Sequence, residues 1–179
     1  NHMYKEGIHD VSFVLCNTDA QALNDSPIPV HLQLGKEGLG AGNKPAKARE
    51  AAEETLDDIK AMLSDGTKMA FITAGMGGGT GTGASPVIAK MAKEMGILTV
   101  AVVTKPFDFE RKKRMNFALE GIEKLREHVD TIIVIPNDKL LEVVDRRTTM
   151  PEALKKADEV LQQGIQGITD LINVPSLIN

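Results

Sequence analysis

The sequence predicts an α/β domain in which a mainly parallel, Rossmann-like sheet is flanked by helices and the chain ends in a long core helix. Three observations support this fold class. Apolar runs of strand length alternate with helical stripes along the 179 residues. Three of the runs are nearly continuous and rich in β-branched residues, which is typical of strands buried on both faces. Six of the nine residues from 75 to 83 are glycines, and they lie between a predicted strand and a predicted helix.

Five runs are expected to form strands. The first is a short apolar run, the second alternates apolar and polar residues as a half-exposed strand does, and the other three are the β-branched runs. Ligands of parallel sheets bind outside the carboxyl ends of the strands, so the loops that follow these runs are where a functional site is expected. In chain order the runs cover residues 11–16, 30–34, 69–72, 97–103 and 131–135.

Helices are expected between the strands, because apolar residues recur there every three or four positions. One stripe covers residues 48–63 and follows Pro45, which suits the first turn of a helix. Another helix is expected to start near Ala84, directly after the glycines. Further stripes predict a helix over 118–129 and a long final helix over 152–173.

Composition excludes several classes of protein. Apolar residues make up 42% and charged residues 26%, the balance of a soluble globular domain. A net charge of −4 and few aromatic residues disfavour nucleic-acid binding, which needs a positive face or stacking platforms. No apolar run approaches the roughly 20 residues that span a bilayer, so we expect a cytoplasmic protein without direct membrane insertion. The single cysteine, Cys16, excludes an intrachain disulfide and is expected to be a buried structural thiol.

The glycine run predicts a phosphate site. Glycines allow the backbone to turn several N–H groups toward one point, and the positive end of the following helix adds to the attraction for an anion. Thr80 and Thr82 supply hydroxyl donors within the run. No lysine follows the glycines, so the run is not a P-loop, and its spacing differs from the dinucleotide fingerprint. A second glycine-rich loop at residues 38–42 is either an ordinary surface turn or a contact for a further phosphate of the same ligand.

Polar residues in the later loops each have two interpretations. Glu110 and Arg114 lie four residues apart and either form a solvated pair or hold ribose and phosphate. Asn137 either caps the helix that follows it or bonds a base or sugar. Asp158 is either solvated surface or an acceptor for two hydrogens of guanine that adenine does not offer. The four histidines have no mutual spacing that suggests a metal site.

Taken together, these motifs resemble a known family. The stretch Gly77-Gly-Gly-Thr-Gly-Thr-Gly83 resembles the signature of the tubulin-type GTPases. Neighbouring motifs resemble, in the family's order, those of the FtsZ family of bacterial cell-division GTPases, and the resemblance covers essentially the whole chain. These motifs occupy residues 17–23, 38–42, 106–110, 135–138 and 166–172.

The resemblance implies a tubulin/FtsZ GTPase domain that binds GTP and GDP together with Mg²⁺. By similarity, the glycine run would hold the phosphates, the 38–42 loop would approach the terminal phosphate, and Asp19 would lie near the metal through water. The residues that the resemblance assigns to the nucleotide are Asn17, Ala41, Gly42, Gly78, Gly79, Thr80, Gly81, Thr82, Pro106, Glu110, Arg114, Asn137 and Asp158.

The resemblance also implies self-assembly into a head-to-tail filament at the mid-cell division ring, with adaptor proteins bound through a C-terminal tail outside this chain. Relative to the family, residues 1–179 are expected to be the GTP-binding domain without its first strand and phosphate loop and without the second domain. No catalytic residue is expected within the chain, because the acidic residues that complete hydrolysis would lie beyond Asn179 and would come from the neighbouring subunit. The chain alone is therefore expected to be nearly inactive.

Two alternatives remain open. A non-catalytic filament or regulatory module would bind nucleotide without hydrolysing it. A Rossmann-like oxidoreductase is disfavoured, because the glycine run follows a middle strand rather than the first. The chain also departs from the family at Leu154, where an aromatic residue that stacks on guanine is common, and leucine offers only an apolar contact there.

Overall fold

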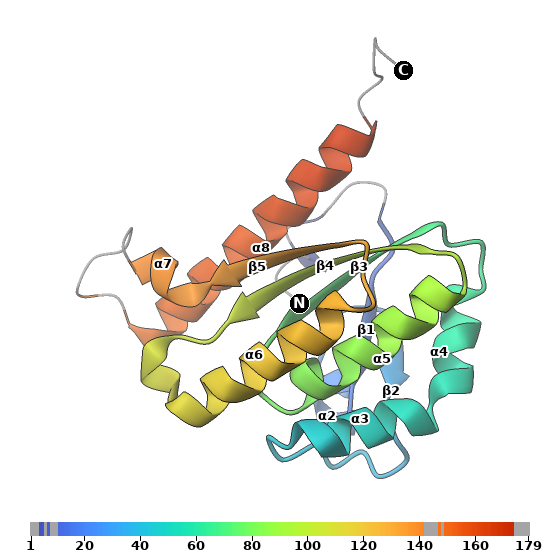
Figure 1. The fold of residues 1–179 in the computed structure, drawn as a ribbon, viewed down its shortest axis with the longest axis horizontal. Helices are drawn as coiled ribbons and strands as arrows, with labels where there is room; N and C mark the ends of the chain where they lie inside the picture. The colour runs from blue at the N-terminus through green and yellow to red at the C-terminus, as the bar shows by residue number, and fades with distance from the viewer. Residues whose placement is uncertain (1–3, 6, 8–10, 142–146, 148, 174–179) are drawn as a thin grey trace.

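The computed structural model describes residues 4, 5, 7, 11–141, 147 and 149–173. Among them, five strands form two parallel sheets (Figure 1). β1 (Val14–Asn17) pairs with β2 (Val30–Gln33), and β4 (Leu98–Lys105) lies between β3 (Met69–Gly75) and β5 (Thr131–Pro136). The predicted α/β class with parallel strands is confirmed, although the strands form two sheets rather than one.

Helices cover both faces of the three-stranded sheet. α5 (Thr80–Glu94) and α6 (Lys112–Arg126) pack on one face, and α8 (Met150–Asn173) packs on the other (Figure 1). β4 alternates accordingly, because Ala101 faces α5 and α6 whereas Val102 faces α8. The other helical segments of the described residues are α2 (Ala20–Asn24), α3 (Pro45–Glu54), α4 (Leu56–Leu63), the 3-10 turn η1 (Asp108–Glu110) and α7 (Asn137–Leu141).

The long final helix is confirmed, but it begins at Met150, two residues before the predicted start. Thr149 and Glu152 explain the difference, because each caps the backbone of the other. The Thr149 N–H donates to Glu152 Oε2 at 2.8 Å, and the Glu152 N–H donates to Thr149 Oγ1 at 3.4 Å.

None of the helices in the described part of the chain has the length and apolar character needed to cross a membrane.

The stripe over residues 48–63 forms two helices instead of one. Thr55 separates α3 from α4, and its hydroxyl donates to the carbonyl oxygens of Ala51 at 2.9 Å and Ala52 at 3.2 Å. These side-chain bonds compete with the helical hydrogen-bond ladder, so the backbone turns at Thr55. The apolar periodicity continues through Thr55, so the spacing of apolar residues does not indicate that the helix breaks there.

α5 begins at Thr80 instead of near Ala84, so two of the glycines lie inside the helix. The Gly83 N–H donates to the Gly79 carbonyl at 3.0 Å, which closes the first helical turn. Gly83 also lies against the start of α3, where an added Cβ atom would stand only 2.0 Å from the carbonyl oxygen of Pro45. α3 and α5 therefore touch through their backbones, which places the loop before α3 beside the N-terminus of α5.

We expect Gly83→Ala to lower the free energy of unfolding by at least about 3 kcal/mol, because the added methyl group forces α3 and α5 apart. Gly164→Ala is the matched control, since Gly164 is also helical and an added Cβ atom meets nothing within 4 Å there. Removing that glycine should raise the unfolding free energy by about 0.5–1 kcal/mol. Urea unfolding followed by circular dichroism measures both, and equal effects of the two substitutions would contradict the close α3–α5 contact.

Cys16 lies in β1 and packs against the apolar cluster that joins the β1–β2 sheet to α3, α4 and α5. The side chain is partly buried, so the prediction of a buried structural thiol is confirmed only in part. Burial disfavours the thiolate and raises the pKa of Cys16 from 9.0 to about 11. The folded chain therefore holds this proton more tightly than the unfolded chain does.

The shifted pKa of Cys16 predicts that part of the stability is lost between about pH 9 and pH 11. Below pH 9 the thiol is protonated in both states, whereas above it the unfolded state ionises first and is favoured. Across this interval the unfolding free energy should fall by about 2–3 kcal/mol because of Cys16. Cys16→Ala should remove it, so the difference in unfolding free energy between wild type and variant should shrink as the pH rises. Parallel pH curves for the two proteins would contradict the burial of the thiol.

Candidate functional site

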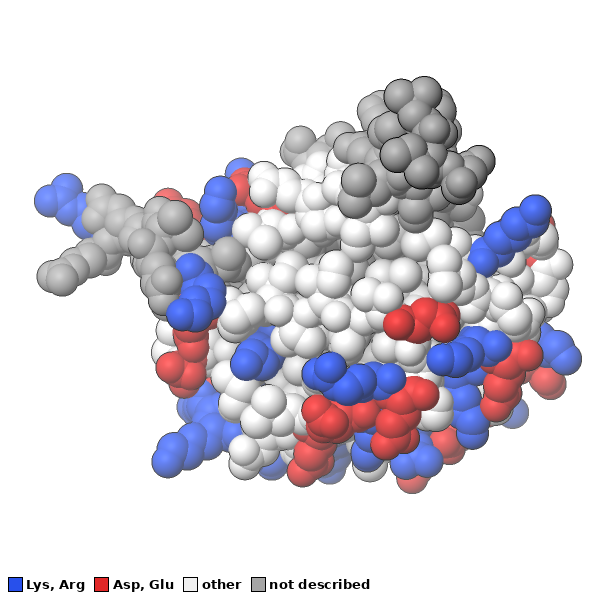
Figure 2. All heavy atoms as spheres, turned by 45° about the horizontal axis from the view of Figure 1, so that its top comes forward, with Lys and Arg blue, Asp and Glu red and all other residues white. Residues whose placement is uncertain are grey.

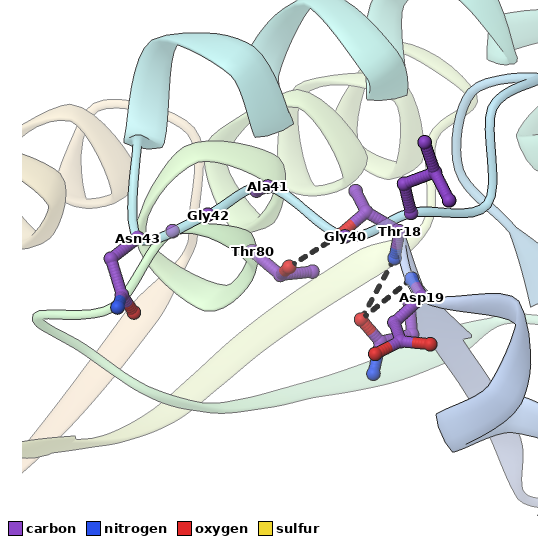
Figure 3. A pocket seen from close by; sticks show the side chains of 10 residues that line it. Thr18, Asp19, Gly40, Ala41, Gly42, Asn43 and Thr80 are labelled. Atoms are coloured by element: carbon purple, nitrogen blue, oxygen red, sulfur yellow. Dashed lines mark hydrogen bonds between the residues drawn. The ribbon is translucent and has the colours of Figure 1, made fainter.

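A cavity of about 290 Å³ lies at the carboxyl end of β1 and beside the start of α5 (Figure 3). Three segments form it: the end of β1 with the two residues after it, the loop before α3, and the first residues of α5. This is the edge of the strands where the sequence predicted a site. The lining residues are Asn17, Thr18, Asp19, Leu39, Gly40, Ala41, Gly42, Asn43, Gly79 and Thr80.

Hydrogen bonds hold these segments together. The hydroxyl groups of Thr18 and Thr80 are 2.8 Å apart and bonded, which joins the end of β1 to the first residue of α5 (Figure 3). The Gly40 N–H donates to the Thr18 carbonyl at 3.0 Å, and the Ala20 N–H donates to the Gly38 carbonyl at 3.0 Å. The glycine-rich 38–42 loop is thus held against the residues that follow β1 and forms one wall of the cavity.

The glycine run packs tightly between neighbouring segments. Gly77 has φ of +111°, which favours glycine, and its N–H donates to Thr82 Oγ1 at 2.8 Å. A Cβ atom on Gly79 would lie 2.9 Å from the Cβ of Ala41 and 3.0 Å from the amide nitrogen of Lys44. Position 79, where the run meets the 38–42 loop, therefore has no room for a side chain.

The N-terminus of α5 has the properties of an anion site. No side chain in the described part of the chain caps this helix, and its first residues are Thr80, Gly81 and Thr82. Uncapped N–H groups and the positive end of a 15-residue helix attract negative charge. The hydroxyl of Thr82 is buried and accepts the Gly77 N–H, so a contact of Thr82 with a phosphate would come from its backbone.

Asp19 is the only carboxylate among the lining residues of the cavity. Its Oδ1 caps α2 by accepting the N–H groups of Gln21 at 2.9 Å and Ala22 at 3.2 Å. Asn17 Oδ1 accepts the N–H groups of Thr18 at 2.8 Å and Asp19 at 3.3 Å, which fixes the turn that follows β1 (Figure 3). Within the described residues, no group of three or more His, Cys, Asp or Glu side chains is arranged to hold a metal. A single carboxylate fits a Mg²⁺ ion that keeps several of its water ligands and is held mainly by the phosphates of a nucleotide.

The other side of the glycine run faces the start of α6. A Cβ atom on Gly77 would lie 3.1 Å from Pro106 Cγ, and one on Gly78 would lie 3.6 Å from Arg114 Nη2. Glu110 Oε1 lies 3.8 Å from Arg114 Nη1, which is a weak ion pair. The structure therefore contains the pair predicted from the sequence, and it places the guanidinium of Arg114 at the margin of the glycine run.

Asn137 is 5% exposed, and its Oδ1 has no hydrogen-bond partner in the described part of the chain. It is the first residue of α7, but an amide oxygen without a partner does not cap that helix. A buried polar atom of this kind is costly unless a ligand pairs with it. Asp158 has an exposed side chain on α8, which packs on α7, and it is not among the residues that line the cavity.

The structure thus brings many of the predicted residues together. Asn17, Asp19, Ala41, Gly42, Gly79 and Thr80 line the cavity. Thr18 and Asn43 also line it and were not predicted from the sequence, whereas Leu39 and Gly40 belong to the predicted 38–42 loop. The position of Thr18 between two predicted residues was a usable signal. Asn43 has φ of +57°, which the sequence did not indicate.

Charge on the surface is mixed. On the face shown in Figure 2, Lys and Arg side chains alternate with Asp and Glu side chains along the lower margin, below a broad uncharged area. This face therefore presents no single large basic area.

Comparison with known proteins places the chain in a family. The sequence model described as "Tubulin/FtsZ family, GTPase domain" matches residues 1–145. The chain belongs to this family. The cell division protein FtsZ of Coxiella burnetii is 58% identical over 181 residues, which is 99% of this chain and 47% of that protein. The resemblance to the FtsZ cell-division GTPases is therefore confirmed.

Solved structures support the same fold. An empty FtsZ dimer from M. jannaschii matches with a TM-score of 0.91 and 47% identity, over 99% of this chain and 52% of that chain. CetZ2 from Haloferax volcanii, solved as a GTPγS-bound protofilament, matches with a TM-score of 0.76 at 20% identity, over 87% of this chain and 48% of that chain. The second match supports the fold alone. The chain spans about half the length of these relatives.

The unpartnered oxygen of Asn137 should affect the stability of the chain even without a ligand. We expect Asn137→Leu to raise the unfolding free energy of the ligand-free chain by about 1 kcal/mol, because it removes a desolvated acceptor and keeps the side-chain volume. Asn17→Leu is the control and should lower it by about 1–3 kcal/mol, since it leaves two backbone N–H groups without their acceptor. Chemical denaturation measures both. A loss for Asn137→Leu as large as that for Asn17→Leu would mean that the Asn137 amide supports the fold.

Proposed function

We propose that this chain binds GTP and GDP and is the nucleotide-binding part of an assembly-coupled GTPase of the cell-division type. One observation carries the proposal. The uncapped N-terminus of α5, the glycine run and the 38–42 loop meet at one cavity, at the carboxyl end of a parallel sheet. Such a cavity favours an anionic ligand with more than one phosphate, and membership in the tubulin/FtsZ GTPase family identifies the class of that ligand.

The phosphates would lie along the glycine run. Backbone N–H groups from Gly78 to Thr82 would hold them, and Ala41 and Gly42 would approach the terminal phosphate across the cavity. Thr80 would add its hydroxyl, whose position is fixed by the bond to Thr18. Preorganised donors of this kind bind charge without having to reorganise, which is the main contribution of a protein to phosphoryl transfer.

The sugar and base would lie on the side of Pro106, Glu110 and Arg114. Asn137 Oδ1 needs a donor, and a ribose hydroxyl or a guanine N–H would supply one. Asp158 would accept the N1 and N2 hydrogens of guanine, which adenine does not offer. Leu154, which is 42% exposed on the same helix, would add an apolar contact with the base.

Mg²⁺ would be held by the phosphates and, through water, by Asp19, and it would neutralise charge that develops on the transferred phosphoryl group. The chain's own residues bind and orient the nucleotide. The cavity's only lining carboxylate, Asp19, is assigned to Mg²⁺ through water, so we propose that the groups that activate the attacking water come from a second subunit. Head-to-tail association would then complete each site, and adaptor proteins would bind the filament at the division ring through a tail outside this chain.

A non-catalytic nucleotide-binding module is the second candidate. The same observation favours it, because the cavity would bind nucleotide whether or not hydrolysis follows. The two candidates differ in their response to self-association. Only the assembly-coupled GTPase gains turnover when a longer form of the protein associates.

The test is competition for a fluorescent GDP analogue by GDP and by ADP. We expect GDP to compete at a concentration at least about 100-fold lower than ADP, because adenine lacks the two hydrogens that Asp158 is proposed to accept from guanine. Thr80→Val should weaken binding about tenfold, since it removes a phosphate donor and the bond to Thr18. Thr67→Val is the control, because Thr67 pairs with Asp65 in an exposed turn away from the cavity.

Phosphate release should be measured on the same sample. The 179-residue chain alone is expected to hydrolyse GTP at close to the background rate. Equal competition by ADP would remove the guanine specificity, and no binding at all would overturn the proposed site. Turnover that rises with the concentration of this chain alone would show that hydrolysis needs no group from outside it.

A further inference from the structure

We propose that Asp138 is a positioning residue, whose carboxylate holds the 106–110 loop against the start of α7 and so sets the spacing between Asn137 and the Glu110–Arg114 pair. This inference rests on the proposed function, because these residues are the ones proposed to contact the sugar and base. It adds a residue to which the family resemblance assigned no role.

A hydrogen bond joins the two loops. Asp138 Oδ1 accepts the backbone N–H of Asp108 at 3.1 Å, although the two residues are 30 positions apart. Asp108 opens η1, which follows β4, and Asp138 is the second residue of α7, which follows β5. β4 and β5 are neighbours in the sheet, and Lys105 pairs with Pro136 at their carboxyl ends. The hydrogen bond between Asp108 and Asp138 therefore joins the loops that follow β4 and β5, just as the ladder joins the two strands.

Each loop is already ordered on its own side of this bond. Glu110 Oε2 accepts the Phe107 N–H at 2.8 Å, and the ring of Phe107 is 1% exposed and stacked on Phe109 with centroids 4.8 Å apart. On the other side, Asn137 is buried at the start of α7. Because each loop is internally fixed, the bond between Asp108 and Asp138 determines how one lies relative to the other.

Asp108 and Asp138 play different parts in the hydrogen bond, and their two carboxyl groups lie close together. Asp108 contributes its backbone, whereas its side chain takes no part in the bond. The two carboxyl groups are close enough that a hydrogen bond to Asp138 and then its negative charge raise the pKa of Asp108, while Lys105 at the end of β4 opposes this. Two ionised carboxylates repel each other, so a neutral acceptor at position 138 should hold the loop at least as well as aspartate does.

The experiment compares three variants of the chain by titration with fluorescent GDP. Asp138→Ala removes the acceptor and should weaken GDP binding about fivefold. Asp138→Asn keeps an oxygen acceptor without the charge and should bind GDP as tightly as wild type or more tightly. Asp108→Ala should also keep wild-type affinity, because the bond uses its backbone N–H.

Two further readouts separate positioning from general damage. Competition by inorganic pyrophosphate should be unchanged within about twofold in Asp138→Ala, since phosphates are proposed to bind at α5, away from the cross-link. Hydrogen exchange at the Asp108 amide, followed by NMR without nucleotide, should be faster in Asp138→Ala and unchanged in Asp138→Asn. This exchange tests the cross-link whether or not nucleotide binds.

The outcomes are distinguishable. If wild type fails to bind GDP while the exchange pattern is as expected, the proposed function fails and the cross-link stands. If wild type binds GDP and Asp138→Ala binds it equally well, the positioning role is overturned. Equal losses of GDP and pyrophosphate in Asp138→Ala, or a loss in Asp108→Ala as large as in Asp138→Ala, would also overturn it.

Discussion

Three backbone segments meet around the start of α5 at distances that leave no room for a Cβ atom, and the rest of the site depends on this contact. Gly79 lies against the 38–42 loop, and Gly83 lies against the carbonyl oxygen of Pro45. A Cβ atom on Gly81 would stand 2.6 Å from the carbonyl oxygen of Gly75. These approaches bring the beginnings of α3 and α5 to one place. The hydroxyl bond between Thr18 and Thr80 then closes the cavity against the end of β1.

The strands and the candidate anion site could be predicted from the sequence because both depend on local composition. Runs of β-branched residues report burial, and a glycine run before a helix reports exposed N–H groups. Pairing between strands could not be predicted, because a buried run does not specify its neighbour, and the structure divides the strands into two sheets. The break at Thr55 and the early start of α5 depend on a side-chain bond and on a contact between helices, and apolar spacing reports neither.

Within the site, the sequence indicated residue types but not their tasks. Thr82 was expected to offer its hydroxyl to phosphate, yet this group is buried and accepts the Gly77 N–H. Asp19 was expected near a metal, and its Oδ1 also caps α2. Asn137 had a capping interpretation that its unpartnered oxygen does not support. In each case the deciding fact is which hydrogen bonds are already made, and that depends on residues distant in the sequence.

The burial of Cys16 has a practical consequence. It is the only cysteine of the chain, and with a pKa of about 11 it is almost entirely in the unreactive thiol form at neutral pH. A cysteine introduced at an exposed position would therefore be the dominant site of alkylation in the folded protein. Leu39 is a suitable position, because it lies on the cavity rim and is 82% exposed. A dye attached there would report directly on what enters or covers the cavity, without removal of the native thiol.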